Sequence, residues 1–214
     1  MRYDLVIFDN DGVLVDSEPI SNKLLAAYLT ELGHLTSYED SLRDYMGAAM
    51  HRVHDLVLER TGQRLPEDFD EVFHGRVFAA FERELGPVPG AVEVLEKLAA
   101  DGVAYCVASS GSHERIRVGH RAAGLERWFE DARIFSSQDV GRGKPAPDLF
   151  LFAAERMGVR PERCVVVEDS PLGVRAAVAA GMDVYAFTAM TPAERLAGAT
   201  RLFSEMQELP ALIS

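Results

Sequence analysis

Short apolar runs alternate with helical patterns from about residue 88 to the end of the chain. The runs are continuous, without a polar residue at every second position, which is typical of strands buried on both faces of a sheet. Pro147 stands near the start of one helical pattern, and Gly158 and Gly181 follow the ends of two. The expected strands span residues 103–109, 132–137, 164–169, 183–188 and 201–203, after a first one at residues 3–9. This alternation predicts an α/β fold, with a parallel sheet covered by helices on both faces.

The segment between the first two expected strands has a different pattern, amphipathic and helical throughout. Ile20, Leu24, Tyr28 and Leu32 recur at four-residue spacing, as one face of a helix requires. Four helices are expected, at residues 19–33, 37–47, 49–62 and 66–86. We predict that residues 17–87 form an all-α helical cap domain, inserted into an α/β core domain made of residues 1–16 and 88–214.

The composition is that of a folded globular protein. Of the 214 residues, 48% are hydrophobic and 26% are charged. The formal net charge of -12 disfavours nucleic acids and anionic membranes as partners. An anionic substrate would therefore need local positive charge or a metal ion. No stretch approaches the roughly 18 apolar residues of a membrane span, and no targeting signal is expected at the N-terminus.

Both cysteines, Cys106 and Cys164, lie inside apolar runs. Two buried, reduced thiols are expected there, in preference to a disulfide or a metal-binding pair. This use of cysteine predicts a cytoplasmic protein, and a monomer is the default expectation.

Polar side chains follow the ends of several expected strands. In open parallel sheets, ligands bind at the carboxyl ends of the strands, so these side chains are expected to line one pocket. They are Asp9, Asn10, Asp11 and Gly12 after the first strand, Ser109, Ser110 and Gly111 after the second, Lys144 in the loop after the third, and Glu168 and Asp169 at the fourth.

Each of these groups has a structural explanation when it is taken alone. Asp11-Gly12 could form a hairpin turn, the serines could cap a helix, and Lys144 could be a solvated surface residue. A calcium-binding loop that starts at Asp9 is excluded, because its glycine would fall at Leu14 and its last acid at Ile20. One reaction centre explains the polar groups after four expected strands more simply than four separate structural roles do.

The residue types at these strand ends suit phosphoryl transfer. The acids Asp9, Asp11, Glu168 and Asp169 would attract a hard cation, and Mg²⁺ suits a few carboxylates completed by water and phosphate. Asp9 could attack phosphorus and form an aspartyl-phosphate. Asp11 could protonate the leaving oxygen and later take a proton from water.

The remaining strand-end groups would hold the transferring phosphoryl group. The Ser109 hydroxyl and the Ser110 N–H, just before a helix start, could bind its oxygens. Lys144 could offset the negative charge of nucleophile and phosphate.

Four segments of the chain resemble the motifs of the haloacid dehalogenase superfamily of phosphohydrolases. They are "FDNDGVLVDSE", "VASSGS", "GKPAPDLF" and "VVVEDSPLGVRAAVAAGM", in the family's order. The resemblance is to the subfamily with a helical cap of the C1 type, close to β-phosphoglucomutase-like phosphatases, and it implies a Rossmann-like core.

The resemblance also implies roles for individual residues. It makes Asp9 the nucleophile and Asp11 the acid and base, and it places Mg²⁺ on Asp9, the Asp11 carbonyl and Asp169, with Glu168 nearby. We assign phosphate binding to Asn10, at a position the family leaves variable, and to Ser109, Ser110 and Lys144.

Departures from relatives narrow the reaction. Asp11 favours phosphate esters over carbon–halogen bonds. The mutase branch has a histidine where this chain has Ser21, and a Ser-Arg pair, after a glycine that matches Gly47, where this chain has Ala49 and Met50. Both differences favour a hydrolase. Lys23 is a poor candidate for the Schiff-base lysine of phosphonatase relatives.

In the cap, Arg76 falls where relatives have a basic residue that faces the substrate, so we predict substrate binding there, with a surface helix charge as the alternative. His51, Arg52, His54 and His74 are further candidates, although a solvated helix face also explains them. Trp128 is expected to pack in the interior.

The sequence thus predicts a Mg²⁺-dependent phosphatase that hydrolyses a small phosphorylated metabolite, a sugar or sugar-acid phosphate, through an aspartyl-phosphate. A hexose-phosphate mutase and a catalytically inactive binding module are the alternatives.

Overall fold

The core of the protein is a parallel sheet. The computed structural model describes residues 2–46 and 50–214, and within them six strands form one sheet in the order β3-β2-β1-β4-β5-β6. The strands are β1 (Leu5–Phe8), β2 (Ala104–Ser109), β3 (Ile134–Ser136), β4 (Cys164–Glu168), β5 (Asp183–Phe187) and β6 (Arg201–Phe203). All neighbouring strands pair in parallel. The predicted α/β class is confirmed.

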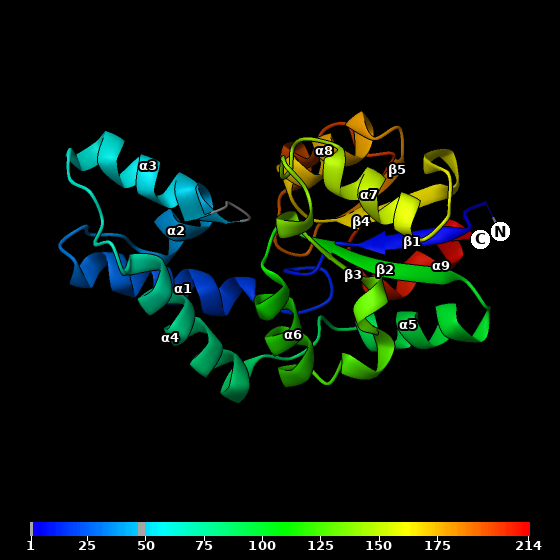
Figure 1. Ribbon diagram of the computed structural model, residues 1–214, viewed down its shortest axis with the longest axis horizontal. Coiled ribbons are helices and arrows are strands. Elements are labelled where there is room, and N and C mark those ends of the chain that lie inside the picture. Colours follow the sequence, from blue (N-terminus) through cyan, green and yellow to red (C-terminus); the bar gives the residue numbers. More distant parts are fainter. Residues whose placement is uncertain (1, 47–49) are drawn as a thin grey trace.

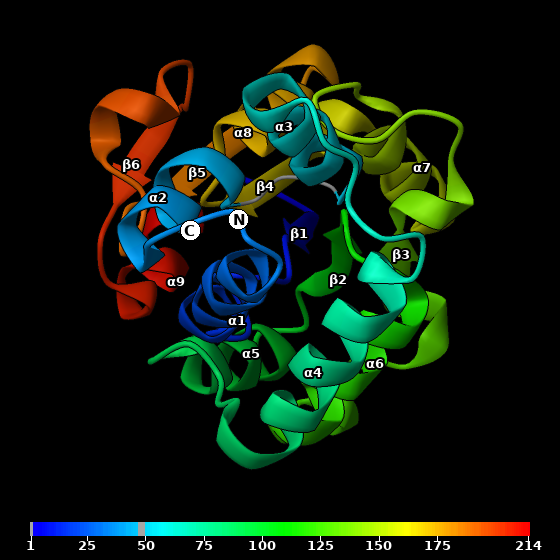
Figure 2. The ribbon, with the colours of Figure 1, turned by 90° about the vertical axis from the view of Figure 1, so that its left-hand side faces the viewer.

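Helices cover both faces of this sheet (Figure 2). On one face, Val6 and Phe8 of β1 belong to a hydrophobic cluster with α5 (Ala91–Ala100), α6 (His113–Ala122) and α9 (Leu209–Ile213). On the other face, Leu5 and Ile7 pack with α7 (Asp148–Arg156) and α8 (Pro171–Ala179). Alternate residues of β1 therefore serve two apolar layers, which is why its sequence is apolar throughout.

The remaining helical pieces are single 3₁₀ turns in the connections. They span Glu126–Trp128, Asp131–Arg133, Ser137–Asp139, Pro161–Arg163, Ala193–Leu196 and Met206–Glu208.

Four helices lie beyond the carboxyl end of β1, to one side of the sheet and away from both chain termini (Figure 1). They are α1 (Glu18–Glu31), α2 (Tyr38–Tyr45), α3 (Met50–Thr61) and α4 (Phe69–Glu84), which we call the helical insertion. Tyr28 of α1 stacks on Phe69 of α4, with ring centroids 4.9 Å apart. Helix α4 begins three residues later than predicted, because the Phe69 N–H closes a turn onto the Pro66 carbonyl.

The chain enters and leaves the helical insertion through two adjacent segments. The Asp16 N–H donates to the Gly86 carbonyl at 3.0 Å, and the Val88 N–H donates to the Leu14 carbonyl at 2.9 Å. These contacts lie within three residues of the predicted limits at 17 and 87. The division into two domains stays a prediction.

The two cysteines are both buried and free, as expected. Burial raises the pKa of Cys164 to about 12 and that of Cys106 further, so both are protonated thiols at neutral pH.

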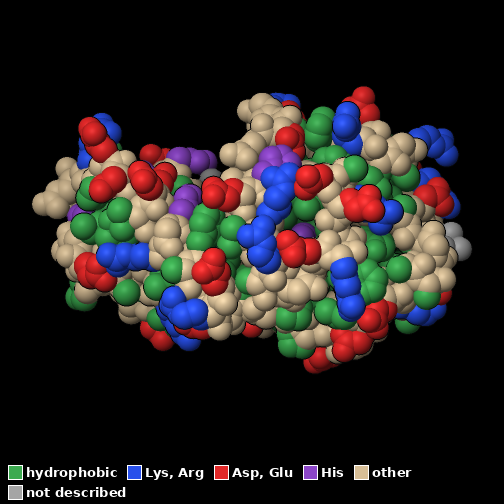
Figure 3. Space-filling model, turned by 60° about the horizontal axis from the view of Figure 1, so that its bottom comes forward, with side chains coloured by type: hydrophobic (Ala, Val, Ile, Leu, Met, Phe, Trp, Pro, Cys, Tyr) green, Lys and Arg blue, Asp and Glu red, His purple; other side chains and the backbone are tan. Residues whose placement is uncertain are grey.

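The surface mixes both signs of charge. On the face shown in Figure 3, acidic and basic side chains are interspersed over the core and the helical insertion. In the described part of the chain, no helix combines the length and apolarity needed to cross a bilayer.

Candidate active site

A cavity of about 240 Å³ lies between the carboxyl ends of the strands and the helical insertion. From the core it is lined by all but one of the predicted residues, namely Asp9, Asp11, Ser109, Ser110, Lys144, Glu168 and Asp169. From the helical insertion it receives Glu18, Ser21, Asn22, Leu25, Tyr45, Met50, Val53, Phe73 and His74. Groups up to 160 positions apart in the sequence therefore meet at one edge of the sheet.

Strand register brings these residues together. Phe8 of β1 is paired with Val107 of β2 on one side and with Val167 of β4 on the other. One residue further, Asp9 leaves the sheet beside Glu168, and its N–H still donates to the Val167 carbonyl at 2.9 Å. The central position of β1 is thus the reason that its carboxyl end reaches side chains from both neighbours.

Lys144 links two of the buried acids. Its Nζ donates to Asp9 Oδ1 at 2.6 Å and to Glu168 Oε1 at 2.7 Å, and only 3% of its side chain is exposed. Burial alone would lower the pKa of Lys144, but the charges of the two carboxylates raise it above its usual value. Lys144 is therefore a buried ammonium group fixed between the candidate nucleophile and Glu168.

The cavity carries an excess of acid. Among the described residues that line it are five carboxyl groups and two cations, Lys144 and Arg115. Burial raises the pKa of Asp9 to about 7, with attraction to Lys144 opposing the shift. Burial and the neighbouring charges of Glu168 and Asp9 raise the pKa of Asp169 well above its usual value. A divalent cation would stabilise Asp9 and Asp169 as anions. The carboxylates that line the cavity therefore fit a divalent cation.

The predicted metal site at Asp9, Asp11, Glu168 and Asp169 stays a prediction. Within residues 2–46 and 50–214, no three His, Cys, Asp or Glu side chains form a metal-binding group by themselves. Mg²⁺ usually binds through one or two carboxylates, with waters and substrate phosphate as further ligands.

Glu168 has a different environment from Asp169. Its Oε1 accepts from Lys144, and its Oε2 accepts from the Ser170 N–H at 2.7 Å. Its carboxyl group occupies the space that a Cβ on Gly173, in the first turn of α8, would fill. Glu168 thus holds Lys144 and the start of α8 in place.

Asp169 packs against the turn after β1. A Cβ at Gly12 would collide with Asp169 Oδ2, and Gly12 also has a φ of +77°, which disfavours other residues. The Asp-Gly pair is therefore a turn that lets two strand ends meet closely, but it forms no hairpin, because both partners of β1, namely β2 and β4, are parallel to it.

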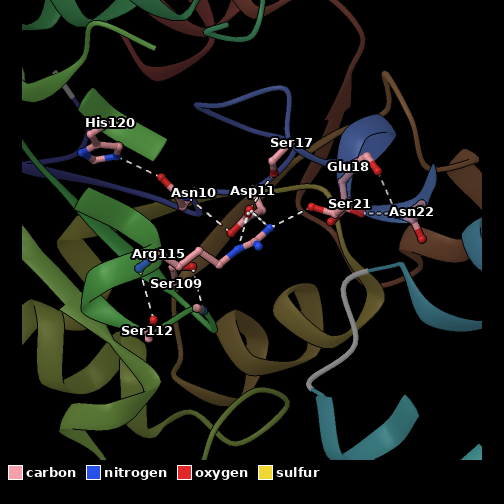
Figure 4. Close-up of polar contacts among 11 residues, drawn as sticks. Asn10, Asp11, Ser17, Glu18, Ser21, Asn22, Ser109, Ser112, Arg115 and His120 are labelled. Atoms are coloured by element: carbon pink, nitrogen blue, oxygen red, sulfur yellow. Dashed lines mark hydrogen bonds and ion pairs between the residues drawn. The ribbon is translucent and has the colours of Figure 1, made fainter. Parts of the chain in front are cut away.

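Asp11 lies at the centre of the hydrogen bonds drawn in Figure 4. Its Oδ1 accepts from Ser17 Oγ at 2.6 Å and from Arg115 Nη2 at 2.7 Å. Burial alone would raise the pKa of Asp11, but attraction to Arg115 and hydrogen bonds from Arg115, Ser17 and Asn10 hold it below its usual value. Asp11 is thus fixed by Asn10 in the turn after β1, Ser17 just before α1 and Arg115 of α6.

Ser109 ends β2 just before α6. Its Oγ accepts from the Gly111 N–H at 3.0 Å, which leaves the hydroxyl proton to be donated into the cavity. Ser112 caps α6 by accepting from the Arg115 N–H at 3.1 Å. The Ser109 loop therefore leads into a helix N-terminus, where anions are favoured.

Asn10 differs from the expectation for a phosphate ligand. It is the predicted core residue whose side chain does not line the cavity. Its Oδ1 lies 2.9 Å from His120 Nε2, in the interior below α6. Only the backbone of Asn10 is left as a candidate for phosphate binding.

Arg76, which was predicted to bind substrate, is not among the residues that line the cavity in this structure. Its Nη1 pairs with Glu31 at 2.8 Å, and its guanidinium lies 4.2 Å from the centroid of the Tyr28 ring. His74, two residues earlier, does line the cavity. Arg76 and His74 face different surroundings because a step of two residues turns a helix by about 200°, which reaches nearly the opposite face.

The other substrate-binding candidates in the helical insertion, His51, Arg52 and His54, do not line the cavity. His54 pairs with Asp70 at 2.7 Å, whereas His51 and Arg52 are exposed. Met50 lines the cavity. Gly47 and Ala49, at the positions used to argue against a mutase, lie outside the described residues.

Arg115 is the functional candidate that the motifs missed. As a single arginine in an amphipathic helix, it has the pattern of a solvated charge. It nevertheless lines the cavity and pairs with Asp11.

The chain is similar to known proteins. Residues 3–181 match the haloacid dehalogenase-like hydrolase family. The 6-phosphogluconate phosphatase of Escherichia coli (strain K12) is 31% identical over 189 residues, which cover 88% of this chain and 84% of that protein. Hexitol phosphatase A of the same organism is 31% identical over 198 residues, covering 92% and 88%.

A solved structure agrees over nearly the whole length. It is a haloacid dehalogenase-like protein of unknown function from Agrobacterium tumefaciens str. C58, with a TM-score of 0.86 and 36% identity over 99% of this chain and 97% of that chain.

Proposed function

The chain belongs to the haloacid dehalogenase-like hydrolases, and on that premise we propose that it is a Mg²⁺-dependent phosphatase of a small phosphorylated metabolite. The observation that carries the proposal is the buried contact of Lys144 with both Asp9 and Glu168, in a cavity that Asp11 and Ser109 also line. A fixed cation beside a carboxylate nucleophile suits a phosphoryl group as its target.

In the first half of the proposed reaction, the Asp9 carboxylate attacks phosphorus. A bond forms between phosphorus and the Asp9 oxygen, and the bond from phosphorus to the ester oxygen breaks. A proton from the bound phosphate monoester monoanion passes to Asp11, which gives it to that ester oxygen, and the alcohol leaves. Ser109 and Lys144 hold the phosphoryl oxygens throughout.

In the second half, the Asp11 carboxylate takes a proton from a water molecule as the water oxygen attacks phosphorus. The bond from phosphorus to Asp9 breaks, which releases inorganic phosphate and restores both carboxyl groups. Bound Mg²⁺ would supply positive charge that offsets the repulsion between Asp9 and the phosphate. Asp9, Asp169 and the Asp11 carbonyl would hold it.

The cavity supports a small substrate. The helical insertion contributes mostly uncharged side chains to its lining, which include Tyr45, Asn22 and the apolar Leu25, Val53 and Phe73, together with Glu18 and His74. A sugar or sugar-acid phosphate is the proposed class, in line with relatives named as phosphatases of 6-phosphogluconate and hexitols. We keep the cytoplasmic location and the monomeric state as predictions.

The test is phosphate release from p-nitrophenyl phosphate and from a panel of sugar and sugar-acid phosphates, each with Mg²⁺ or with EDTA. We expect release only with Mg²⁺, and none from Asp9→Asn with an unchanged circular dichroism spectrum. An isomer formed from a hexose 1-phosphate, without free phosphate, would establish the mutase instead. Absence of phosphate release from every compound would leave only the inactive binding module.

A further inference from the structure

Arg115 reaches the cavity from the first turn of α6. Its Nη2 and Nε lie 2.7 Å and 3.2 Å from Asp11 Oδ1, and Nη2 also lies 3.2 Å from Ser21 Oγ of α1. Its guanidinium lies 5.0 Å from the centroid of the Phe81 ring of α4. Only 16% of the Arg115 side chain is exposed, and its contacts with Asp11 and Ser21 are drawn in Figure 4.

The position of Arg115 in its helix is unfavourable in isolation. Its backbone N–H donates to the cap residue Ser112, so Arg115 stands at the third position of α6. A cation in the first turn is repelled by the positive end of the helix dipole. The ion pair with Asp11 offsets that repulsion.

The two oxygens of Asp11 differ in their contacts. Oδ1 receives three hydrogen bonds, one from Ser17 and two from Arg115. Within the described part of the chain, the hydrogen bond to Oδ2 is a long one, at 3.4 Å from Asn10 Nδ2. An oxygen that already accepts three donors is a poor place for a proton, so Oδ2 is the oxygen that can carry one.

We propose that Arg115 is a positioning residue, which fixes the Asp11 carboxyl group so that Oδ2 exchanges the proton with the departing oxygen. The proposal rests on the proposed phosphatase function and adds a residue to it. Arg115 acts here through Asp11, because its Nε and Nη2 groups both donate to Oδ1 and hold that oxygen in place, which leaves Oδ2 for the proton.

The test compares two leaving groups. An alkyl phosphate releases an alkoxide, which needs a proton, whereas p-nitrophenyl phosphate releases a stable anion that needs little protonation. For Arg115→Gln we expect kcat for a good alkyl substrate to fall by about 10²-fold, and kcat for p-nitrophenyl phosphate to fall by less than about 10-fold. Arg115→Lys keeps the charge without the paired N–H groups, so it should show the same inequality to a smaller degree.

Arg117→Gln is the matched control. Arg117 lies on the same helix, is 44% exposed and pairs with Asp131 at the surface. We expect both substrates to be hydrolysed as in the unsubstituted protein.

Equal losses for the two leaving groups in both Arg115 variants would assign Arg115 a structural role and overturn the proposal, as would no loss at all. Melting temperatures are measured alongside. Should Arg115→Gln fail to fold, the comparison rests on Arg115→Lys. If the unsubstituted protein releases no phosphate, the proposed phosphatase function is wrong and this proposal is wrong with it. If the unsubstituted protein releases phosphate but the variants lack the expected difference between the two leaving groups, only the proposal for Arg115 is wrong.

Discussion

His120 gives the protein a stability that depends on pH. His120 belongs to the last turn of α6 and is 1% exposed, with its ring 4.9 Å from that of Phe129. Its Nε2 lies 2.9 Å from Asn10 Oδ1, and since that oxygen can only accept, Nε2 carries the hydrogen. Nδ1 is buried without a partner among the described residues. A second proton would therefore occupy a site with no acceptor.

Burial lowers the pKa of His120 from 6.5 to about 4, although the charge of Asp11 opposes the shift. Between pH 6.5 and about pH 4, His120 binds a proton in the unfolded chain but not in the folded protein. The contribution of His120 to the free energy of unfolding is therefore complete above pH 6.5 and is lost as the pH falls toward 4. The full difference corresponds to about 3 kcal/mol, of which about 2 kcal/mol is lost by about pH 5.

The assay is urea unfolding of the unsubstituted protein and of His120→Gln, at about pH 7.5 and about pH 5. Glutamine keeps an N–H donor for Asn10 and does not titrate. The pH dependence that comes from all other groups is the same in both proteins and cancels in the comparison. We expect the unsubstituted protein to lose about 2 kcal/mol more than the variant between the two conditions. Equal losses would show that His120 is not held neutral by burial, and would refute the reasoning.

Three further substitutions test the site. Lys144→Met should abolish phosphate release and lower the free energy of unfolding by about 3–5 kcal/mol, because it strands Asp9 and Glu168 as buried acids; unchanged urea unfolding would argue against the ion pair. Gly173→Ala should cost about 1–3 kcal/mol by displacing Glu168, whereas Gly119→Ala, whose methyl would make ordinary contacts, should not; equal melting temperatures would contradict this. Arg76→Ala should leave KM for every substrate within about 2-fold, since Arg76 faces Glu31; a substrate-selective rise would return it to the site.

The sheet could be predicted because its strands are apolar on both faces. The expected strand at residues 164–169 was observed as Cys164–Glu168, and its last residue differs only because Asp169 has already turned into the cavity. Parallel strands end at one edge, so the convergence of Asp9, Ser109 and Glu168 followed from the order of elements alone. Lys144 lies in a loop, and its contact with two buried acids could be expected only from their excess charge.

Helix faces were harder to predict, because a helix offers no edge at which polar groups must gather. Arg76 and His74 are separated by two residues and face different surroundings, and the sequence alone did not show which of them faces the cavity. Only the packing of α4 on α1 and α6 decides between them.

The sequence did contain a signal that Arg115 is functional. The signal is the position of Arg115 in its helix more than its residue type. The segment "SSGSHER" puts an arginine three residues after a helix-capping serine, where the helix dipole favours acids. A cation that opposes the dipole beside an expected phosphate loop implies a local anion strong enough to hold it. The structure supplies that anion as Asp11, at 2.7 Å. A charge placed against its helix dipole therefore points to the active site when the nearest predicted carboxylate belongs to that site.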